Sequence, residues 1–510
     1  MANPSLQIGN SNWAIKEDNL LGYSTAGTRF VPQPITMTRA SAGTRVNSSG
    51  LVETVELLGS EEIVNGDFAT DSDWVKGTNI TISNGSAVFT DVTPYAELRQ
   101  NSVFTIGKTY KINFTVSGFN GGSVLVQESP NVNPQITVIN ASNDYSILYT
   151  AQTTTGITFK TVSGTVSMNL YNISVKESTK NNLARVDYDG TASSLLVEPQ
   201  RINVNTYSED FSQSFYIKDS GVSVGTTNNV SPSGESNATQ IEVNNNGRIY
   251  ANVASDTYAS SIFIKAGTFA YFKFGGNVDL VAGTFSGGTI ESFGNGWFKI
   301  TKQYTGNRPF QIQAYPDGTY SSHTTTGDYY TWGSQIEAGS YATSYIPTDG
   351  GTVTRVQDQY SKTGISNLIN SEEGVLFLEV AALANDGTSR AISIFQNGSN
   401  FIKFLYSATS NRVDFVAFSE GNLSCNITKV ISNTTENAKF ALKWKQNDFA
   451  LWIDGIEEGT DLSGNAPLGM DKMYFTDEGG SNGKLFGKVK QLQVFKTALT
   501  DSELATLTTI

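Results

Sequence analysis

Carboxylates are the side chains in this sequence that could carry out a reaction without help from a cofactor. Two carboxyl groups on either side of a glycosidic bond can hydrolyse it, one as general acid and the other as nucleophile or base. The last third of the chain holds several acids: Glu372, Glu373, Glu379, Asp414 and Asp454. Glycan hydrolysis is therefore the reaction that these acids could serve, the alternative being that they are solvated surface residues.

Histidine and cysteine offer less chemistry, because each occurs once. His323 stands in a polar run at 321–325 with no acid beside it, so we expect a solvated loop residue rather than a ligand or base. Cys425, flanked by Leu423 and Ile427, is predicted to be a small core residue. A single thiol allows neither an intrachain disulfide nor a structural zinc site.

The composition favours several small β domains. The chain has 510 residues, too many for one domain, and its length predicts three or four. Glycine is plentiful at 48 residues, whereas charged residues make up only 16% and aromatic residues 11%. This profile is typical of short strands joined by many turns rather than of long helices. We therefore predict an all-β protein.

The charge excludes some partners. The net charge is −13 and the lysines and arginines form no cluster, so nucleic-acid binding is not expected. No run of 18 apolar residues predicts a membrane span, and the first residues have neither a basic nor an apolar signal-peptide region. We expect synthesis in a cytoplasm without insertion into a membrane.

Alternating residues predict two jelly-roll or β-sandwich modules before the C-terminal one. Tyr110, Ile112 and Phe114 would share one face of a strand in the first module. Trp297 and Trp332 are expected to pack inside the sheets of the second module. The predicted divisions are an N-terminal arm at 1–58, a jelly roll at 59–180, a connector at 181–210, a second jelly roll at 211–358, and a sandwich at 359–510.

The C-terminal stretch resembles concanavalin A-like and laminin-G-like sandwiches. A strand at 449–453 runs into Asp454-Gly455, and a last strand precedes a helical turn with Thr500 as N-cap and Glu503 at the capping-box position. In that family, catalytic members carry an E-x-D-x-x-E arrangement that this stretch lacks. We therefore expect the acids of this module to be solvated, and the protein not to be an enzyme.

Three motifs resemble a pattern found in structural proteins of tailed bacteriophages. They are TRASAGTRVNSSGLVETV at 38–55, LLVEPQRIN at 195–203, and WGSQIEAGSYATSYIP at 332–347. The resemblance implies a head or tail fibre of a virion, anchored to other virion proteins through residues 1–58, forming a homotrimer and binding host-surface polysaccharide. The alternatives are a polysaccharide-degrading tailspike-type enzyme and a secreted bacterial adhesin.

The first jelly roll interrupts this pattern, so we interpret it as an inserted module, which predicts that Val55 and Asn182 are neighbours. Its opening, Asn-Gly-Asp-Phe at 65–68, is similar to carbohydrate-binding-module jelly rolls. That resemblance makes Asp67 a candidate ligand for a structural calcium ion, although Phe68 and Trp74 are expected in the core. Exposed loop aromatics are the candidate sugar contacts: Tyr95 and Tyr320.

Overall fold

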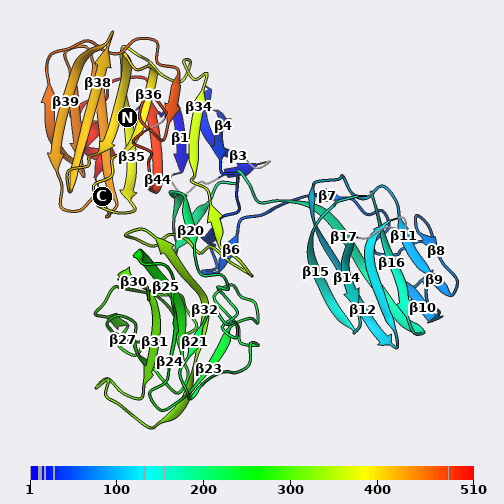
Figure 1. Cartoon of the computed structure of the whole chain (residues 1–510). Helices are drawn as coiled ribbons and strands as arrows, with labels where there is room; N and C mark the ends of the chain where they lie inside the picture. Colours follow the sequence, from blue (N-terminus) through cyan, green and yellow to red (C-terminus); the bar gives the residue numbers. More distant parts are fainter. Residues whose placement is uncertain are drawn as a thin grey trace. The chain divides into compact units, whose positions relative to one another are not determined.

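The computed structural model describes residues 2–9, 14–16, 19–26, 29–129, 134–153, 155–480 and 482–509. These residues are almost entirely β-structure, which confirms the predicted fold class of tandem β-sandwiches (Figure 1). They divide into two compact units, Glu56–Lys180 and the remainder, Met1–Val55 with Asn181–Ile510. Among the described residues no helix has the length and apolar character needed to cross a bilayer.

The unit Glu56–Lys180 is a sandwich of two antiparallel sheets. Its strands are β7 (Leu57–Glu61), β8 (Val75–Lys76), β9 (Ile80–Ser83), β10 (Ser86–Val92), β11 (Glu97–Gln100), β12 (Thr109–Asn120), β13 (Ser123–Ser129), β14 (Gln135–Ile139), β15 (Asn143–Thr150), β16 (Gly156–Ser163) and β17 (Val166–Thr179). One sheet has the order β15-β12-β17-β10-β9 and the other β14-β13-β16-β11-β8. Strand β7 pairs with β17, so that Leu57 lies opposite Thr179 and the two ends of the unit lie together.

The core of this unit follows the predicted alternation. Tyr110, Ile112 and Phe114 are all buried between the sheets. Opposite Phe114, strand β17 carries an extra residue, and Asn172 there has a φ of 50°. This β-bulge re-aims the strand, so that Ile173 as well as the earlier residues of β17 face the core. Phe68 and Trp74 are buried as expected.

A second sandwich lies in the middle of the chain. Its strands are β20 (Arg201–Asn203), β21 (Ile217–Lys218), β22 (Val222–Val224), β23 (Thr239–Asn244), β24 (Arg248–Ala251), β25 (Asp256–Ala266), β26 (Tyr271–Lys273), β27 (Asn277–Asp279), β28 (Thr284–Phe285), β29 (Thr289–Ser292), β30 (Trp297–Gly306), β31 (Phe310–Tyr315), β32 (Thr326–Ala338) and β33 (Val353–Arg355). One sheet has the order β22-β23-β32-β25-β30-β29 and the other β21-β24-β31-β26-β27-β28.

The two tryptophans of this module are buried, but not where the sequence predicts. The core between the sheets contains the isoleucines of β25, β30 and β32, together with phenylalanines of the facing sheet. Trp297 and Trp332 instead pack with Phe263 and Tyr345 in a separate cluster, which also includes Val52. Since neighbouring residues of a strand point to opposite faces, Phe263 between the core residues Ile262 and Ile264 lies on the outward face.

The third sandwich contains the end of the chain. Its strands are β34 (Gln359–Thr363), β35 (Glu373–Ala382), β36 (Arg390–Asn397), β37 (Asn400–Tyr406), β38 (Arg412–Ser419), β39 (Asn422–Val430), β40 (Ala438–Lys445), β41 (Phe449–Ile453), β42 (Ile456–Asp461), β43 (Lys472–Tyr474) and β44 (Gly487–Phe495). The pairing β44-β35-β40-β41-β42 forms one sheet, and β34-β43-β36-β37-β38-β39 forms the other. Cys425 is buried in its core, as predicted.

The N-terminal segment belongs to this third sandwich rather than forming an extended arm. Its strands are β1 (Leu6–Gly9), β2 (Ala14–Lys16), β3 (Asn19–Ala26) and β4 (Arg29–Thr38). Strand β1 pairs with β44, and β4 pairs with β34. Leu6, Ile8 and Ile35 are completely or almost completely buried in the same core as the C-terminal strands. The apolar residues of these strands are covered by sheets of the same chain, a pairing that the prediction of an extended arm at 1–58 did not include.

The predicted connector is also built of strands. A hairpin of β18 (Val186–Asp189) and β19 (Ala192–Val197) joins the third sandwich through pairing of β19 with β44. A short hairpin of β5 (Thr44–Val46) and β6 (Val52–Thr54) lies against β18. The helix α1 (Asp501–Thr508) ends the chain, with the predicted capping box between Thr500 and Glu503.

Candidate functional site

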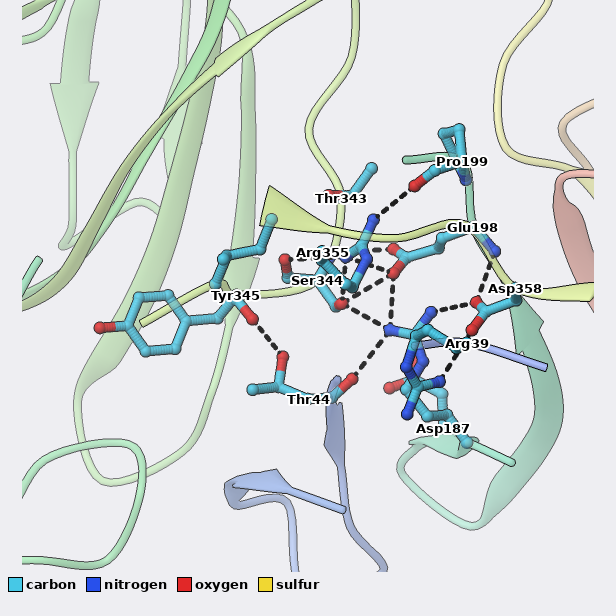
Figure 2. Close-up of polar contacts among 12 residues, drawn as sticks. Arg39, Thr44, Asp187, Glu198, Pro199, Thr343, Ser344, Tyr345, Arg355 and Asp358 are labelled. Atoms are coloured by element: carbon cyan, nitrogen blue, oxygen red, sulfur yellow. Dashed lines mark hydrogen bonds and ion pairs between the residues drawn. The ribbon is translucent and has the colours of Figure 1, made fainter. Parts of the chain in front are cut away.

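Five buried charged residues meet at the ends of strands that belong to the second and third sandwiches. Arg39 follows β4, Arg185 precedes β18, Glu198 follows β19, Arg355 ends β33 and Asp358 precedes β34. We call this set the ionic junction (Figure 2). Each residue ends a strand or lies directly beside one, so forming the strands carries the charge into the interior. The carboxylates and guanidinium groups must then pair with one another.

Arg185 is the centre of the ionic junction. Its Nη1 donates to Oε2 of Glu198 at 2.6 Å and to the carbonyl oxygen of Thr44 at 3.0 Å, while its Nη2 donates to Oδ2 of Asp358. Arg39 donates from Nη1 to the other carboxylate oxygen of Asp358 at 2.8 Å. Both oxygens of Asp358 are therefore occupied by guanidinium groups, which fixes its orientation.

Arg355 extends the ionic junction towards the second sandwich. Its Nη1 lies 2.7 Å from Oε2 of Glu198, and its Nη2 donates to the carbonyl oxygen of Pro199 at 3.0 Å. Ser344 donates from its backbone N–H to Oε1 of Glu198 at 2.7 Å and from its hydroxyl to Oε2 at 2.7 Å. Figure 2 shows these groups converging from separate segments of the chain.

The protonation states follow from this pairing. Burial alone would raise the pKa of Glu198, but Arg355 and Arg185 outweigh it and hold that pKa well below its usual range. Burial likewise opposes the charge on Arg185, and Asp358 and Glu198 overcome it, so its pKa lies above the ordinary value. Burial raises the pKa of the nearby Glu337, which Arg355 opposes. The five residues of the ionic junction are paired with one another and held in place, and none of them is a free nucleophile.

The third phage-like motif builds the shell around the ionic junction. Gly333 has a φ of 62° at a bulge opposite Phe263, where a Cβ would lie 3.0 Å from the phenyl ring. Gln335 accepts from the backbone N–H of Ile346 at 2.5 Å. Glu337 accepts from the backbone N–H of Thr343 at 2.7 Å. These two hydrogen bonds hold residues 343–346 against β32. Ser344, which lies between the bonded residues, is thereby placed next to Glu198.

A second feature is a hollow of about 600 Å³ in the second sandwich. Glu209 lines it, with its Oε1 accepting from the Tyr345 hydroxyl and its Oε2 from the Asn237 amide, both at 2.9 Å. Burial raises the pKa of Glu209, the Tyr345 hydrogen bond lowers it, and Asp349 in the same hollow raises it further. This is a carboxyl group of perturbed acidity beside open space.

The structure does not bring the predicted site residues together. Tyr95 is 76% exposed, with Lys160 Nζ 5.9 Å from its ring centre. Tyr320 packs edge-on against Tyr315, and its hydroxyl donates to a backbone carbonyl. Asp67 is exposed and accepts only a 3.3 Å bond from Ala69 N–H among the hydrogen bonds of the described chain. Within the residues that the structure describes, no cluster of three potential metal ligands occurs.

The acids of the third sandwich are separated and locally bonded. Glu379 accepts from Asn437 and Gln491, each at 2.8 Å, while Asp414 pairs with Arg412 at 2.7 Å. Their strands, β35 and β38, belong to opposite sheets, and both side chains point outward because their neighbours fill the core. The remaining acids, Glu372, Glu373 and Asp454, lie in or beside turns or pair with lysine or backbone groups. None faces Glu379 or Asp414 as a catalytic partner would.

His323 is better ordered than a solvated loop residue would be. Its Nε2 lies 2.9 Å from the carbonyl oxygen of Ala314, its Nδ1 accepts from Thr325 N–H, and its ring packs near Phe269. These contacts occupy both ring nitrogens. The residue is a structural part of its loop.

Sequence reasoning named the segments of the ionic junction but not its residues. The signal was present in the sequence: a single charge within a short apolar run, as in L-L-V-E-P at 195–199 and L-A-R-V at 183–186. A lone charge in such a run is excluded from water once the strand forms, so it demands a partner of opposite charge. The partners, however, lie too far away in sequence to be assigned by pattern alone.

No protein-family model matches the chain, and a comparison with curated proteins gives no match. Among solved structures, the CBM40 of the Ruminococcus gnavus IT-sialidase bound to α2,3-sialyllactose is 15% identical, with a TM-score of 0.26 over 29% of this chain and 91% of that one. The botulinum neurotoxin type G receptor-binding domain is 11% identical, with a TM-score of 0.23 over 29% and 41%. Trypanosoma rangeli sialidase in complex with the inhibitor DANA is 9% identical, with a TM-score of 0.23 over 92% and 98%.

Similarity at this level supports neither an activity for this chain nor its absence. Sialidases match as well as carbohydrate-binding modules do. The prediction that the protein is not an enzyme is therefore wrong. The lack of an E-x-D-x-x-E arrangement excludes one kind of active site in the C-terminal module. It does not exclude other active sites there or in the rest of the chain.

Proposed function

We propose that the protein is a structural component of a bacteriophage virion, a head or tail fibre that displays β-sandwich modules for binding glycans on the host surface. The observation that carries this proposal is the ionic junction. The motifs at 38–55 and 195–203 supply its residues Arg39 and Glu198, and the motif at 332–347 supplies Ser344, which donates to Glu198. If the three motifs matched the phage pattern by chance, we would not expect their residues to meet in one buried network. Their meeting there supports treating the three motifs as one pattern.

The modular architecture also supports this role. The ionic junction ties strands of the second and third sandwiches together, and the unit Glu56–Lys180 has its own core. Single protein–glycan contacts are weak, and repeated copies of a module convert weak binding into avidity. A homotrimeric fibre would supply that repetition.

Electron microscopy of virions labelled with gold-conjugated antibody against the purified protein tests the proposal. The same antibody applied to intact cells serves as the comparison. Label at a tail tip or baseplate supports a tail fibre, and label on the capsid supports a head fibre. Label on cells but not on virions would favour the secreted adhesin and overturn the virion role.

A glycan-cleaving enzyme is the second candidate, favoured by Glu209 and its hollow. A carboxyl group whose pKa is raised by burial can act as a general acid, and Asp349 lines the same space. Incubation of the protein with host-surface polysaccharide, followed by measurement of released reducing ends, tests this activity. Hydrolysis that is lost in Glu209→Gln and kept in the exposed control Glu235→Gln would establish it.

A further inference from the structure

We propose that a groove beside the ionic junction, rather than a sandwich face, is the binding site for a neutral oligosaccharide. The inference rests on the proposed glycan-binding function and assigns it to a place. Two adjoining hollows of about 200 and 770 Å³ form the groove. They share five lining residues, so they are continuous: Val46, Asp187, Glu291, Phe293 and Lys488.

Three separate parts of the chain form the walls of the groove. The hairpin β5–β6 supplies Val46 and Ser49, and the hairpin β18–β19 supplies residues 187–190. The end of β29 and the turn after it supply residues 291–294. The combined space falls in the size range of sites that enclose small ligands.

The floor of the groove is rigid. Asp187 Oδ1 accepts from the backbone N–H of Val46 at 2.8 Å, and its Oδ2 accepts from Lys488 Nζ at 3.2 Å. At its inner end the groove reaches Glu198 of the ionic junction and Ser344, which donates to it. Side chains held in this way lose little freedom when a ligand binds, which favours affinity.

The rim of the groove is clear of side chains at its turns. Gly190 and Gly294 both have positive φ, and no atom lies within 4 Å of the position a Cβ would occupy at either residue. The walls therefore end in backbone turns that leave the opening unobstructed. A chain-like ligand could enter along the groove and extend beyond it.

The lining matches the chemistry of a sugar. Half-buried rings of Tyr188 and Phe293 offer apolar faces, and Phe293 is braced by Phe263 at a ring separation of 4.9 Å. Carboxylates can accept from sugar hydroxyls, while ammonium and guanidinium groups can donate to sugar oxygens. The charged residues that line the two hollows outside the buried Glu198 balance: Asp187, Asp189 and Glu291 against Arg45, Lys299 and Lys488. This balance favours a neutral ligand over a polyanion.

Binding of the full chain to an array of neutral and acidic oligosaccharides, followed by calorimetric titration with the best neutral hexose oligosaccharide, tests the inference. Ser292→Trp adds bulk at an exposed position of the groove without removing a contact. Ser322→Trp adds the same bulk to an exposed loop outside it. We expect at least a tenfold loss of affinity for Ser292→Trp and none for Ser322→Trp, with equal melting temperatures.

A second variant, Tyr188→Ser, keeps the test decisive should the tryptophan disturb folding. Neutral-sugar binding that is unchanged in both groove variants would overturn the groove while leaving glycan binding in place. Binding of acidic oligosaccharides alone would also overturn it. No binding to any glycan would overturn the groove and the glycan-binding part of the proposed function together.

Discussion

Arg185 and Asp358 form an ion pair in which both side chains are completely buried, although 173 residues separate them in the sequence. The whole second sandwich lies between them in the chain. An unpaired charge in the interior is strongly destabilising, so the start of the connector 181–210 and the segment after β33 must reach their final positions together. The ionic junction therefore couples the folding of segments that the sequence keeps far apart.

Removing one carboxylate from the ionic junction should be strongly destabilising. Glu198→Gln leaves Arg185 and Arg355 without their shared partner, and we expect a loss of about 3–5 kcal/mol in the free energy of unfolding. Denaturant unfolding monitored by tryptophan fluorescence measures it. The control is Glu53→Gln, which breaks the partly exposed pair with Arg45 and should cost less than about 1 kcal/mol. Equal losses for the two variants would contradict a structural role for the junction.

The ionic junction should also make the stability of the protein depend on pH. The pKa of Glu198 is lower in the folded than in the unfolded protein, so its stabilising effect is fully present above the ordinary value of 4.5. It is lost as the pH falls through the depressed folded pKa. The difference in melting temperature between the wild type and Glu198→Gln should therefore shrink as the pH falls from about 5 to about 3. A difference that stays constant over this range would show that the ionised carboxylate is not the source of stability.

The unit Glu56–Lys180 should be removable. Its own core and the pairing of Leu57 with Thr179 predict that a short glycine–serine linker in place of residues 57–179 leaves the rest folded. Circular dichroism and thermal melting of the shortened chain, and of the unit expressed alone, measure this. Each should unfold cooperatively. An unfolded shortened chain would mean that the remainder depends on the unit.

The capping box of α1 gives a smaller, local test. Thr500 accepts from the Glu503 N–H, and the Glu503 carboxylate accepts from the Thr500 N–H at 3.0 Å. Thr500→Ala should reduce stability by about 1 kcal/mol. Ser502→Ala, on the exposed side of the same turn, is the matched control and should change stability by a few tenths of that. Thermal melting of both variants compares them.

The sequence predicted the parts of the fold that local patterns determine. Alternation placed Tyr110, Ile112 and Phe114 in the core, and turn and cap residues located Asp454-Gly455 and Thr500 correctly. It failed where a segment pairs with strands hundreds of residues away, as β1 does with β44. Period-two alternation shows that a strand has one buried face, but not which sheet covers that face.

The candidate site shows the same division. The motifs pointed to the right segments, because Gly333, Gln335 and Glu337 of β32 act locally: Gly333 at a bulge, and the other two in holding residues 343–346. The groove could not be anticipated, since its residues come from three hairpins and from β44, which meet only in the folded chain. Its aromatic residues, Tyr188 and Phe293, stand in sequence contexts that look like ordinary strand ends. The predicted candidates Tyr95 and Tyr320 were chosen for loop exposure alone.

The pairing of Leu57 with Thr179 has a consequence for inheritance. Because the unit between them enters and leaves through adjacent strands, its coding segment can be exchanged by two crossovers, one near each end of the unit, without altering any residue of the ionic junction. A lineage that carries this architecture can replace one domain while the rest of the gene stays under constant selection. Variation among relatives should therefore concentrate between these two positions, with sharp borders near residues 56 and 180.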